Sequence, residues 1–457
     1  LVACGLVDID GPTIMAVHAH PDTSGIWDGV AAQLDGSARV ERCSADGLAA
    51  ALTGRAPVHV VAAGPAAAAV WEYVMRPDAA DHVASVTVSV PARRRGLPGR
   101  RHRAALLPDR VAVPVQLIVG TGKVDDDLAA RVPRLWRRVV TTGRPTPATH
   151  PQVYARSVRQ LVEHLEGAPA ARELRRAEVG RSRGRFGDTL VSVTGAGSGI
   201  GRETALAFAK EGAELIISDV DADGLAETAR RLAEDGAIAH SYLVDVADTA
   251  AVEAFAEEVC TAHGVPDVVV NNAGVGHAGF FLDTPAEEFD RVFDINFGGV
   301  VNGCRAFGRR LVERGTGGHI VNVASMASYT PVNLMNAYCT SKAAVFMFSD
   351  CLRAELDSAG IGLTTICPGV IGTNIVNTTR FSLPDTKGRD VETLRARAKR
   401  GFAVRRYGPE KVARAIVAAV TKNKAVRPVT PEAYLVYGIA HAAPQAMRSA
   451  ARGGNIV

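Results

Sequence analysis

Short apolar runs alternate with amphipathic stretches through the second part of the chain, from Thr189 to the C-terminus. The apolar runs are rich in β-branched residues and typical of buried parallel strands; they are Thr189–Thr194, Glu214–Ser218, His240–Val244, Asp267–Asn271, His319–Ser325 and Gly362–Cys367. Apolar residues recur at helical spacing in the stretches between them, which include Arg202–Glu211, Asp223–Glu234, Thr249–His263 and Ala337–Asp357. Strand–helix alternation of this kind predicts an α/β fold, a Rossmann-type doubly wound parallel sheet.

A second α/β pattern precedes this one, and the two are separated by a change in composition. Residues 166–188 are basic, rich in small residues and without apolar periodicity, so they predict a linker with a helical turn in its middle. The predicted domains are therefore 1–165 and 189–457. Within the second domain, a long polar and basic loop at about 374–406 predicts a lid over the substrate, and residues 429–457 form a C-terminal extension.

Composition narrows the classes of function. With 47% apolar and 22% charged residues the 457-residue chain is typical of a soluble globular protein, and no run of about twenty apolar residues predicts a membrane span. The N-terminus lacks the pattern of a secretion signal. A net charge of +4 does not indicate a nucleic-acid partner. The seven cysteines are scattered without a CxxC pair, which argues against a disulfide framework and a zinc site, so we expect a cytoplasmic protein without a metal.

A glycine-rich turn follows the first strand of the second domain. It reads Thr194-Gly-Ala-Gly-Ser-Gly-Ile-Gly201 and leads directly into a helix. Glycines let the backbone turn tightly and approach a pyrophosphate, whose charge is met by N–H groups at the helix start. The glycine spacing differs from the GxGxxG pattern of many dinucleotide folds. Its position between a strand and a helix nevertheless predicts a nucleotide site.

Asp219 ends the second strand, one helix and one strand after the glycine turn. An acidic side chain at this place accepts hydrogen bonds from the ribose hydroxyls of the adenosine half. A 2′-phosphate would meet a like charge there, and neither Ala196 nor Val220 supplies a basic residue to offset it. The pattern therefore predicts NAD rather than NADP as cofactor. The alternative is that Asp219 only caps a turn.

Tyr338 and Lys342 lie four residues apart at the start of a strongly helical segment, so they share one helix face. A free tyrosine has a pKa near 10, and a neighbouring cation favours the phenolate and lowers that pKa. Ser325 ends the preceding strand and is thereby placed at the carboxyl edge of the sheet, where doubly wound folds bind ligands. These residues predict a tyrosine general acid/base.

Together these motifs resemble those of the short-chain dehydrogenase/reductase family, in order and spacing, over about residues 190–430. The resemblance implies hydride transfer between a nicotinamide cofactor and a small-molecule secondary alcohol or ketone. It implies that Tyr338 moves the proton and that Ser325 steadies the substrate oxygen. Lys342 would tune the tyrosine and bind ribose, and Asn296 would hold a water linked to Lys342. Family members commonly pair through the helices that carry Asn296 and Tyr338, so a homodimer or homotetramer is expected.

The resemblance also implies a set of cofactor contacts from the glycine turn, the strand ends and a later Pro-Gly turn. They are Gly195, Ser198, Gly199, Ile200, Gly201, Asp219, Asp245, Val246, Asn272, Ala273, Gly274, Tyr338, Lys342, Pro368, Gly369, Ile371 and Thr373. Asp245 and Val246 would contact adenine, residues 272–274 would support the adenosine side, and Thr373 with Ile371 would meet the nicotinamide carboxamide.

The first domain resembles an α/β-hydrolase of the epoxide-hydrolase branch. Residues 12–27 are similar to its first strand and oxyanion turn, and residues 57–66 to the strand that leads to the nucleophile. The nucleophile position holds Gly64, the acid position Lys123 and the base position Arg144. No nucleophile is therefore expected.

Two further features bear on this domain. Asp125 and Asp22 are alternative acids, whereas His150 lies beyond the base position and is more typical of a packing or capping residue. Only about twenty residues, 91–110, stand where the hydrolase cap would be inserted, and their arginines indicate a solvated loop. The order of a hydrolase-like part before a short-chain dehydrogenase part resembles two-part actinobacterial proteins. We expect a shortened remnant without catalytic activity.

The substrate end is less well defined by the sequence. Candidate pocket residues, chosen by their proximity to the motifs, are His277, Met326, Tyr329 and Met335. Arg380, Lys387 and Arg389 in the polar loop either recognise an anionic group or are simply solvated. The C-terminal extension, with Arg448 and Arg452, either packs on a partner subunit or the first domain, or makes peripheral contact with a membrane. Two alternatives to the dehydrogenase remain, a bifunctional hydrolase–dehydrogenase and a non-catalytic NAD-binding scaffold.

Overall fold

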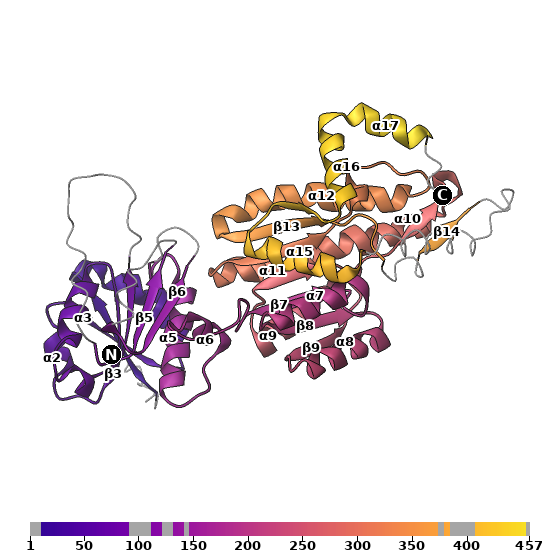
Figure 1. The fold of residues 1–457 in the computed structure, drawn as a ribbon. Helices are drawn as coiled ribbons and strands as arrows, with labels where there is room; N and C mark the ends of the chain where they lie inside the picture. Colours follow the sequence, from indigo (N-terminus) through magenta and orange to yellow (C-terminus); the bar gives the residue numbers. More distant parts are fainter. Residues whose placement is uncertain are drawn as a thin grey trace, which may run out of the picture. The chain divides into compact units, whose positions relative to one another are not determined.

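The computed structural model describes residues 11–90, 111–120, 131–140, 146–372, 379–383 and 407–453 (Figure 1). The chain forms two compact units: the first is Leu1–Ser182 with Arg314–Thr316, and the second is Arg183–Glu313 with Gly317–Val457. Several positions singled out by the sequence lie outside the described residues: they are Lys123, Asp125, Arg144, Thr373, Lys387, Arg389, the arginine-rich loop and almost all of the predicted lid.

The first unit is built on a six-stranded parallel sheet of order β2-β1-β3-β4-β5-β6. Its strands are β1 (Thr13–His18), β2 (Arg39–Ser44), β3 (Val58–Ala63), β4 (Val83–Val90), β5 (Val115–Val119) and β6 (Leu135–Val139). Its helices are α1 (Asp28–Leu34), α2 (Leu48–Leu52), α3 (Ala66–Val74), α5 (Pro151–Leu165) and α6 (Arg172–Ala177), with 3-10 turns at Pro21–Trp27 and Ala79–Asp81.

The inner strands of this sheet are buried on both faces and are mostly apolar, whereas the edge strand β2 is polar and partly exposed. Successive side chains of a strand point to opposite faces. Ile14 and Ala16 of β1 therefore pack with residues of α1 and α5, whereas Met15 and Val17 pack with residues of α2 and α3. This parallel α/β architecture is consistent with the hydrolase-like domain expected from the sequence.

The predicted linker contains helix α6, whose Leu174 is fully buried against Trp136 of β6 and Leu161 of α5. Arg138 of β6 is buried as well and pairs with Glu173 of α6 at 3.0 Å. The helical turn expected in this stretch is therefore packed against the first unit.

The second unit is built on a seven-stranded parallel sheet of order β15-β13-β12-β10-β7-β8-β9. Its strands are β7 (Leu190–Thr194), β8 (Glu214–Asp219), β9 (Ala239–Leu243), β10 (Val268–Asn271), β12 (Gly318–Val323), β13 (Ile361–Cys367) and β15 (Val426–Pro428). Six of them match the predicted strands within two residues. The three-residue edge strand β15 was not predicted, because so short a run carries no periodicity.

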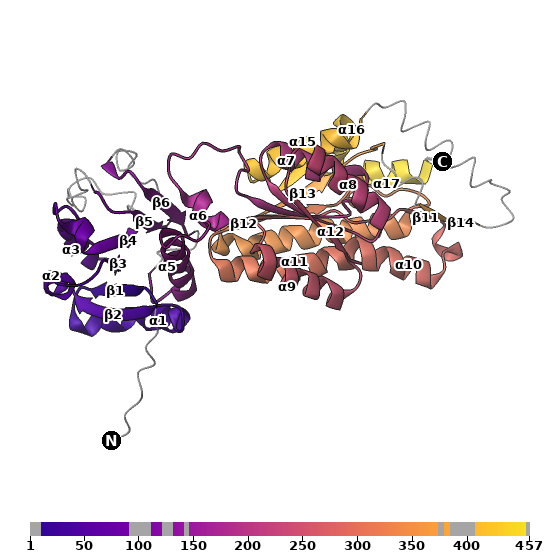
Figure 2. The ribbon, with the colours of Figure 1, turned by 90° about the horizontal axis from the view of Figure 1, so that it is seen from below.

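Helices cover both faces of this sheet, as the doubly wound prediction requires (Figure 2). On one face lie α7 (Gly199–Lys210), α8 (Ala222–Glu234) and α15 (Pro409–Thr421), and on the other α9 (Thr249–His263), α11 (Gly299–Arg314) and α12 (Asn336–Leu356). The chain order reverses at β7, which lies between β8 and β10. The carboxyl ends of β7 and β10 therefore flank the crevice where such folds bind ligands.

Shorter elements surround that end of the sheet. They are the paired strands β11 (His277–Gly279) and β14 (Arg380–Ser382), the helix α10 (Ala286–Phe293), a π-helical turn at Asp294–Gly298, and 3-10 turns at Phe281–Asp283 and Met326–Ser328. A further 3-10 turn, Asp357–Ala359, lies at the opposite end, before β13.

The C-terminal extension forms two helices, α16 (Pro431–Ala442) and α17 (Pro444–Gly453). The hydroxyl of Tyr329 donates to the carbonyl oxygen of Ala433 at 3.1 Å, and its ring meets that of Tyr437 edge-on at 5.3 Å. The extension thus packs on its own unit, an arrangement that the alternatives drawn from the sequence did not include. In the described part of the chain, no helix is both long enough and apolar enough to cross a membrane.

Candidate active site

The glycine turn connects β7 to α7 and requires its glycines. Gly195 and Gly199 have φ angles of 65° and 53°, in the left-handed region. A Cβ on Gly201 would lie 2.0 Å from the carbonyl oxygen of Gly195. The side chain of Ser198, the residue before α7, makes no capping hydrogen bond to the helix. The first N–H groups of α7 are thus presented at the crevice, which fits a pyrophosphate.

Two side chains that the sequence argument did not single out hold this turn in place. The Thr194 hydroxyl accepts hydrogen bonds from the backbone N–H groups of Asn272 and Ala273 at 3.0 and 3.1 Å. Arg202 donates to the carbonyl oxygens of Gly197 and Gly224. The sequence could have indicated both Thr194 and Arg202, because they stand at the two ends of the glycine motif. The amide of Asn272 also donates to Thr194 O at 2.9 Å, so this residue braces the turn from β10.

Asp219 lies at the end of β8, beside the turn. Its Oδ2 accepts a hydrogen bond from the Gly197 N–H at 2.7 Å, and its Oδ1 accepts one from the Asp221 N–H at 3.0 Å. Asp219 therefore does cap a turn, as the alternative interpretation of the sequence had it. The same contacts fix the carboxylate next to the glycine turn, as an adenosine-binding carboxylate has to be.

Asp245 and Val246 follow β9 and are more constrained than the sequence suggested. The Asp245 Oδ1 accepts a hydrogen bond from the Ala247 N–H at 2.9 Å. Val246 is 8% exposed, and its carbonyl oxygen accepts from the Asn302 amide at 3.0 Å. Its side chain lies against Gly299, where an added Cβ would be 2.6 Å away. Val246 thus packs on α11 at the rim of the proposed adenine site.

Tyr338 and Lys342 lie in the first two turns of α12, as predicted. The Tyr338 phenol lies close to the side chain of Ser325, whose hydrogen-bonding effect lowers the pKa of the phenol. Lys342 is 4% exposed, and its Nζ donates to the carbonyl oxygen of Val323 at 3.0 Å. The Ser328 hydroxyl donates to the carbonyl oxygen of Lys342 at 2.8 Å. The end of β12 and the start of α12 are in this way tied together around the phenol.

Asn296 is fully buried in the π-helical turn between α10 and α11. Its Oδ1 accepts from the Val275 N–H at 2.8 Å, and its Nδ2 donates to Val275 O at 3.0 Å and to Ser341 Oγ at 3.1 Å. A Cβ on Gly274 would lie 3.0 Å from Asn296 Oδ1 and 3.3 Å from Lys342 Nζ. The structure therefore brings Asn296 next to Lys342, and π-helical turns are frequent at functional sites.

The charges at this site differ from the expectation in one respect. Burial lowers the pKa of Lys342 to about 8. Burial raises the pKa of Tyr338, against the hydrogen bond from Ser325, which lowers it, and Cys339 raises it further. The sequence led us to expect a lowered tyrosine pKa beside the lysine. The structure gives the opposite direction, because enclosure penalises the phenolate while the ammonium donates to Val323.

The Pro-Gly turn after β13 closes the site on its other side. The carbonyl oxygen of Pro368 accepts from the Met326 N–H at 2.8 Å. A Cβ on Gly369 would lie 2.1 Å from the Thr430 hydroxyl, so only glycine fits there. Ile371 is 4% exposed.

The four candidate pocket residues have separate surroundings. His277 is buried and its Nε2 meets Ser382 Oγ at 3.1 Å, within the β11–β14 pair. Burial lowers the pKa of this histidine. Tyr329 faces the C-terminal extension. Met326 and Met335 are half-buried and border the turn before α12. His277 and Tyr329 thus have packing roles that sequence proximity did not reveal.

An open hollow of about 490 Å³ lies beside the site rather than at it. It is lined by residues of the turn at Met326–Ser328, of α12, α16 and α17, among them Ala327, Cys339, Ala343, Met447 and Arg448. None of the four predicted catalytic residues lines it. The reacting groups are therefore not part of this hollow.

In the first unit, Gly64 stands at the tight turn between β3 and α3, with φ of 59°. Strand, turn and helix have the arrangement in which hydrolases present their nucleophile. A Cβ here would meet nothing within 4 Å, so space for a side chain exists but no side chain is present. Asp22 is exposed, and His150 precedes α5 and is hydrogen-bonded to Thr149.

Comparison with known proteins agrees with this division. The family described as short chain dehydrogenase matches residues 189–382. "Probable oxidoreductase EphD" of Mycobacterium tuberculosis is 46% identical, over 97% of this chain and 95% of its own length. That alignment runs over 564 residues, more than the 457 of this chain, so the relative contains sequence without a counterpart here.

Two further relatives match the second unit. D-threitol dehydrogenase of Mycolicibacterium smegmatis is 37% identical, over 42% of this chain and 73% of its own length. The crystal structure of a short chain dehydrogenase/reductase from Burkholderia phymatum in complex with NAD is 28% identical, with a TM-score of 0.52, over 57% of this chain and 95% of that one. The chain therefore belongs, through its second unit, to the short-chain dehydrogenase/reductase family of oxidoreductases, in a two-part architecture that it shares with EphD.

Proposed function

We propose that the second unit interconverts a secondary alcohol and a ketone with NAD(H), and that Tyr338 is its general acid/base. One observation carries this proposal. The Tyr338 phenol lies beside the Ser325 side chain, and Lys342 and Asn296 lie together beside Gly274, all at the carboxyl edge of the sheet that also presents the glycine turn.

The side chains divide the work between proton and oxygen. In the direction of oxidation, the phenolate of Tyr338 takes the hydroxyl proton of the alcohol, and in reduction the phenol returns it to the carbonyl oxygen. Ser325, whose side chain lies beside the phenol, steadies that oxygen. A nicotinamide dinucleotide, when bound, supplies the acceptor or donor of the hydride.

Lys342 and Asn296 act on the proton rather than on the hydride. With its pKa at about 8, Lys342 is largely charged at neutral pH and favours the phenolate once that charge develops. The burial of Tyr338 keeps the phenol protonated in the resting protein. Asn296 holds the backbone at Val275 and the hydroxyl of Ser341, one residue before the lysine, so it positions the ammonium.

We also propose NAD as the preferred cofactor. The Asp219 carboxylate is fixed by two backbone N–H groups beside the glycine turn. A ribose with free hydroxyls donates to such a group, whereas a 2′-phosphate is repelled by it. Arg202, the cation next to the turn, is occupied by the carbonyl oxygens of Gly197 and Gly224 and by Thr228.

The test is a screen of secondary alcohols and ketones for absorbance change at the nicotinamide band, with NAD and NADP side by side. Tyr338→Phe should lower kcat by about two to four orders of magnitude. Tyr434→Phe removes an exposed hydroxyl on α16 and serves as the matched control. Near-normal turnover of Tyr338→Phe would refute the acid/base role. Nucleotide binding without any turnover would favour a scaffold, and a clear NADP preference would refute the role of Asp219.

We propose that the first unit does not catalyse hydrolysis. The Gly64 turn keeps the backbone conformation of a nucleophile turn without a nucleophile. The full chain should therefore leave epoxides and esters intact. Hydrolysis that survives in Tyr338→Phe would instead establish a bifunctional hydrolase–dehydrogenase.

Self-association through α11 and α12 is a further part of the proposal. Met347 of α12 is 63% exposed and Val312 of α11 is 46% exposed, so both helices present an apolar side chain that a partner subunit would cover. Light scattering should give a dimer or tetramer, and Met347→Glu should shift it toward the monomer.

A further inference from the structure

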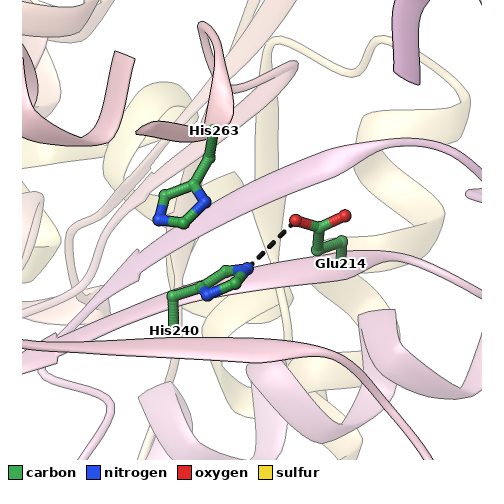
Figure 3. Close-up of side chains that lie close together, drawn as sticks. All are labelled: Glu214, His240 and His263. Carbon is green, nitrogen blue, oxygen red and sulfur yellow. Dashed lines mark hydrogen bonds and ion pairs between the residues drawn. The ribbon is translucent and has the colours of Figure 1, made fainter. Parts of the chain in front are cut away.

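Three side chains with metal-binding chemistry meet at the end of the second sheet opposite the crevice. Glu214 begins β8, His240 is the second residue of β9, and His263 is the last residue of α9 (Figure 3). One ligand atom from each lies within 4.8 Å of the other two. The group therefore converges on one point, although its members come from three separate elements of the chain.

The contacts within this cluster show how the three side chains face one another. His240 Nε2 lies 3.1 Å from Glu214 Oε1. The two imidazole rings are stacked, with centroids 3.8 Å apart and planes inclined by 24°. Figure 3 shows the His263 ring lying over the His240 ring, with the Glu214 carboxylate directed at the His240 ring. If both rings were protonated, this stacking would bring two like charges together.

The donor set is one that zinc ions use. Two imidazole nitrogens and a carboxylate oxygen form a three-ligand zinc site with a fourth position for water. At metal–ligand distances of about 2.0–2.1 Å, tetrahedral ligands are about 3.3–3.5 Å apart. The 3.1 Å separation of His240 and Glu214 is close to that size. The widest separation, 4.8 Å at most, has to shorten to reach it, and rotation about side-chain bonds covers such a change.

The surroundings support a cation. The Tyr242 hydroxyl is hydrogen-bonded to His263 Nε2 at 2.8 Å, and a bond of this kind orients a metal-binding imidazole through its other nitrogen. The side chains of His240 and Glu214 are 31% and 17% exposed, which leaves a path for an ion.

We propose that Glu214, His240 and His263 form a binding site for one zinc ion per chain, separate from the cofactor crevice. The ion would neutralise the carboxylate, keep both stacked imidazoles in the neutral form and join the edge strand β9 to the end of α9. Because the site lies at the amino end of β8 and the crevice lies at its carboxyl end, the ion would not take part in the hydride transfer. Cysteine spacing, on which the expectation of no metal rested, carries no information about such a site.

The experiment is a calorimetric titration of Zn²⁺ into the full chain, expressed without a polyhistidine tag and freed of metal with a chelator. We expect one Zn²⁺ per chain. His263→Gln and Glu214→Gln should each weaken binding at least tenfold. Glu214→Gln keeps a side-chain oxygen that can accept the hydrogen bond from His240, so we expect this variant to keep the fold of the wild type. His20→Gln, which removes an exposed imidazole of the first unit, should bind as the wild type does.

Two further measurements keep the outcome decisive. Tyr242→Phe removes no ligand but should also weaken Zn²⁺ binding, by about tenfold, because His263 loses its orienting bond. Co²⁺ should give a visible absorption band with the wild type and His20→Gln, and none with His263→Gln. Circular dichroism confirms that each variant is folded. Absence of stoichiometric binding, or equal affinity in Glu214→Gln, Tyr242→Phe and His20→Gln, overturns the proposal.

Discussion

Replacing Gly201 with alanine tests whether the glycine turn is set by close packing. The added Cβ would lie 2.0 Å from the Gly195 carbonyl oxygen and 2.6 Å from the Asn272 amide nitrogen. Ordinary van der Waals contacts begin at 3.4 Å, so both of these neighbours would have to move away. The backbone oxygen belongs to a tight turn and cannot rotate away as a side chain can.

The cost has two parts. Overpacking of this kind destabilises by about 1–3 kcal/mol. The displaced Asn272 amide also loses its bonds to Thr194 O and Gly195 O, at about 1 kcal/mol each. We therefore expect the second unit to lose about 3–5 kcal/mol of unfolding free energy. The moved turn should also lose one or more charge-assisted bonds to a pyrophosphate, which weakens NADH binding by roughly 10- to 100-fold.

The assay uses the distribution of aromatic residues. All three tryptophans, Trp27, Trp71 and Trp136, belong to the first unit. Tryptophan fluorescence in urea therefore follows the first unit, while circular dichroism follows both, so the loss should appear only in the second signal. NADH binding is read from the fluorescence of the nicotinamide.

Gly438→Ala is the matched control. Gly438 also lies in a helix, α16, and an added Cβ there meets nothing within 4 Å. This variant should be neutral or more stable by up to about 1 kcal/mol, because alanine favours helix. If Gly201→Ala has the same free energy of unfolding and the same affinity for NADH as Gly438→Ala, the packing argument is refuted.

Four further results are expected. Asp219→Ala should lower the preference for NAD over NADP by about 10- to 100-fold in kcat/KM, the value of one charge-assisted contact, and an unchanged ratio would exclude the carboxylate from cofactor choice. Lys342→Met should abolish turnover, yet at pH 7 it should gain up to about 3 kcal/mol of stability, because burial moves the lysine pKa from 10.5 to about 8. Between pH 8 and 10.5 this lysine binds more protons in the unfolded chain than in the folded one, so the free energy of unfolding of the wild type rises over that range. The stability gained by Lys342→Met should therefore be smaller at pH 9.5 than at pH 7. Equal gains in urea titrations at the two pH values would contradict this reasoning. Asn296→Leu leaves both polar groups of Val275 without their side-chain partner and should cost about 2–4 kcal/mol, measured by circular dichroism in urea. Gly64→Ala should cost about 1–2 kcal/mol in the tryptophan-detected transition, because its φ is 59°, and a neutral effect would show that the turn adapts.

Local features of this protein could be predicted from the sequence. Six strands of the second unit were located to within two residues, because buried parallel strands are short apolar runs bounded by polar residues. The position of the glycine turn followed from its place between a strand and a helix. The shared face of Tyr338 and Lys342 followed from helical periodicity. The expectation that the first unit has no nucleophile rests on Gly64 and stays a prediction.

Other features depend on how distant segments meet. The stacking of His240 on His263 and their contact with Glu214 arise from the pairing of β8 with β9 and from the end of α9. The packing of Tyr329 on α16 joins parts of the chain that are far apart in sequence. The raised pKa of Tyr338 is a consequence of enclosure, which no spacing reveals.

The sequence by itself therefore determined the helices, the strands and the motifs at their ends, because sterics and periodicity act within a few residues. Strand order, register and burial were decided only by the tertiary structure. Strand order, register and burial determine which side chains from distant parts of the chain lie together. They therefore determine the charge state of Lys342 and the assembly of the cluster at Glu214. The free energies of burying a charge and of binding an ion depend on these neighbours, so they cannot be inferred before the sheet is assembled.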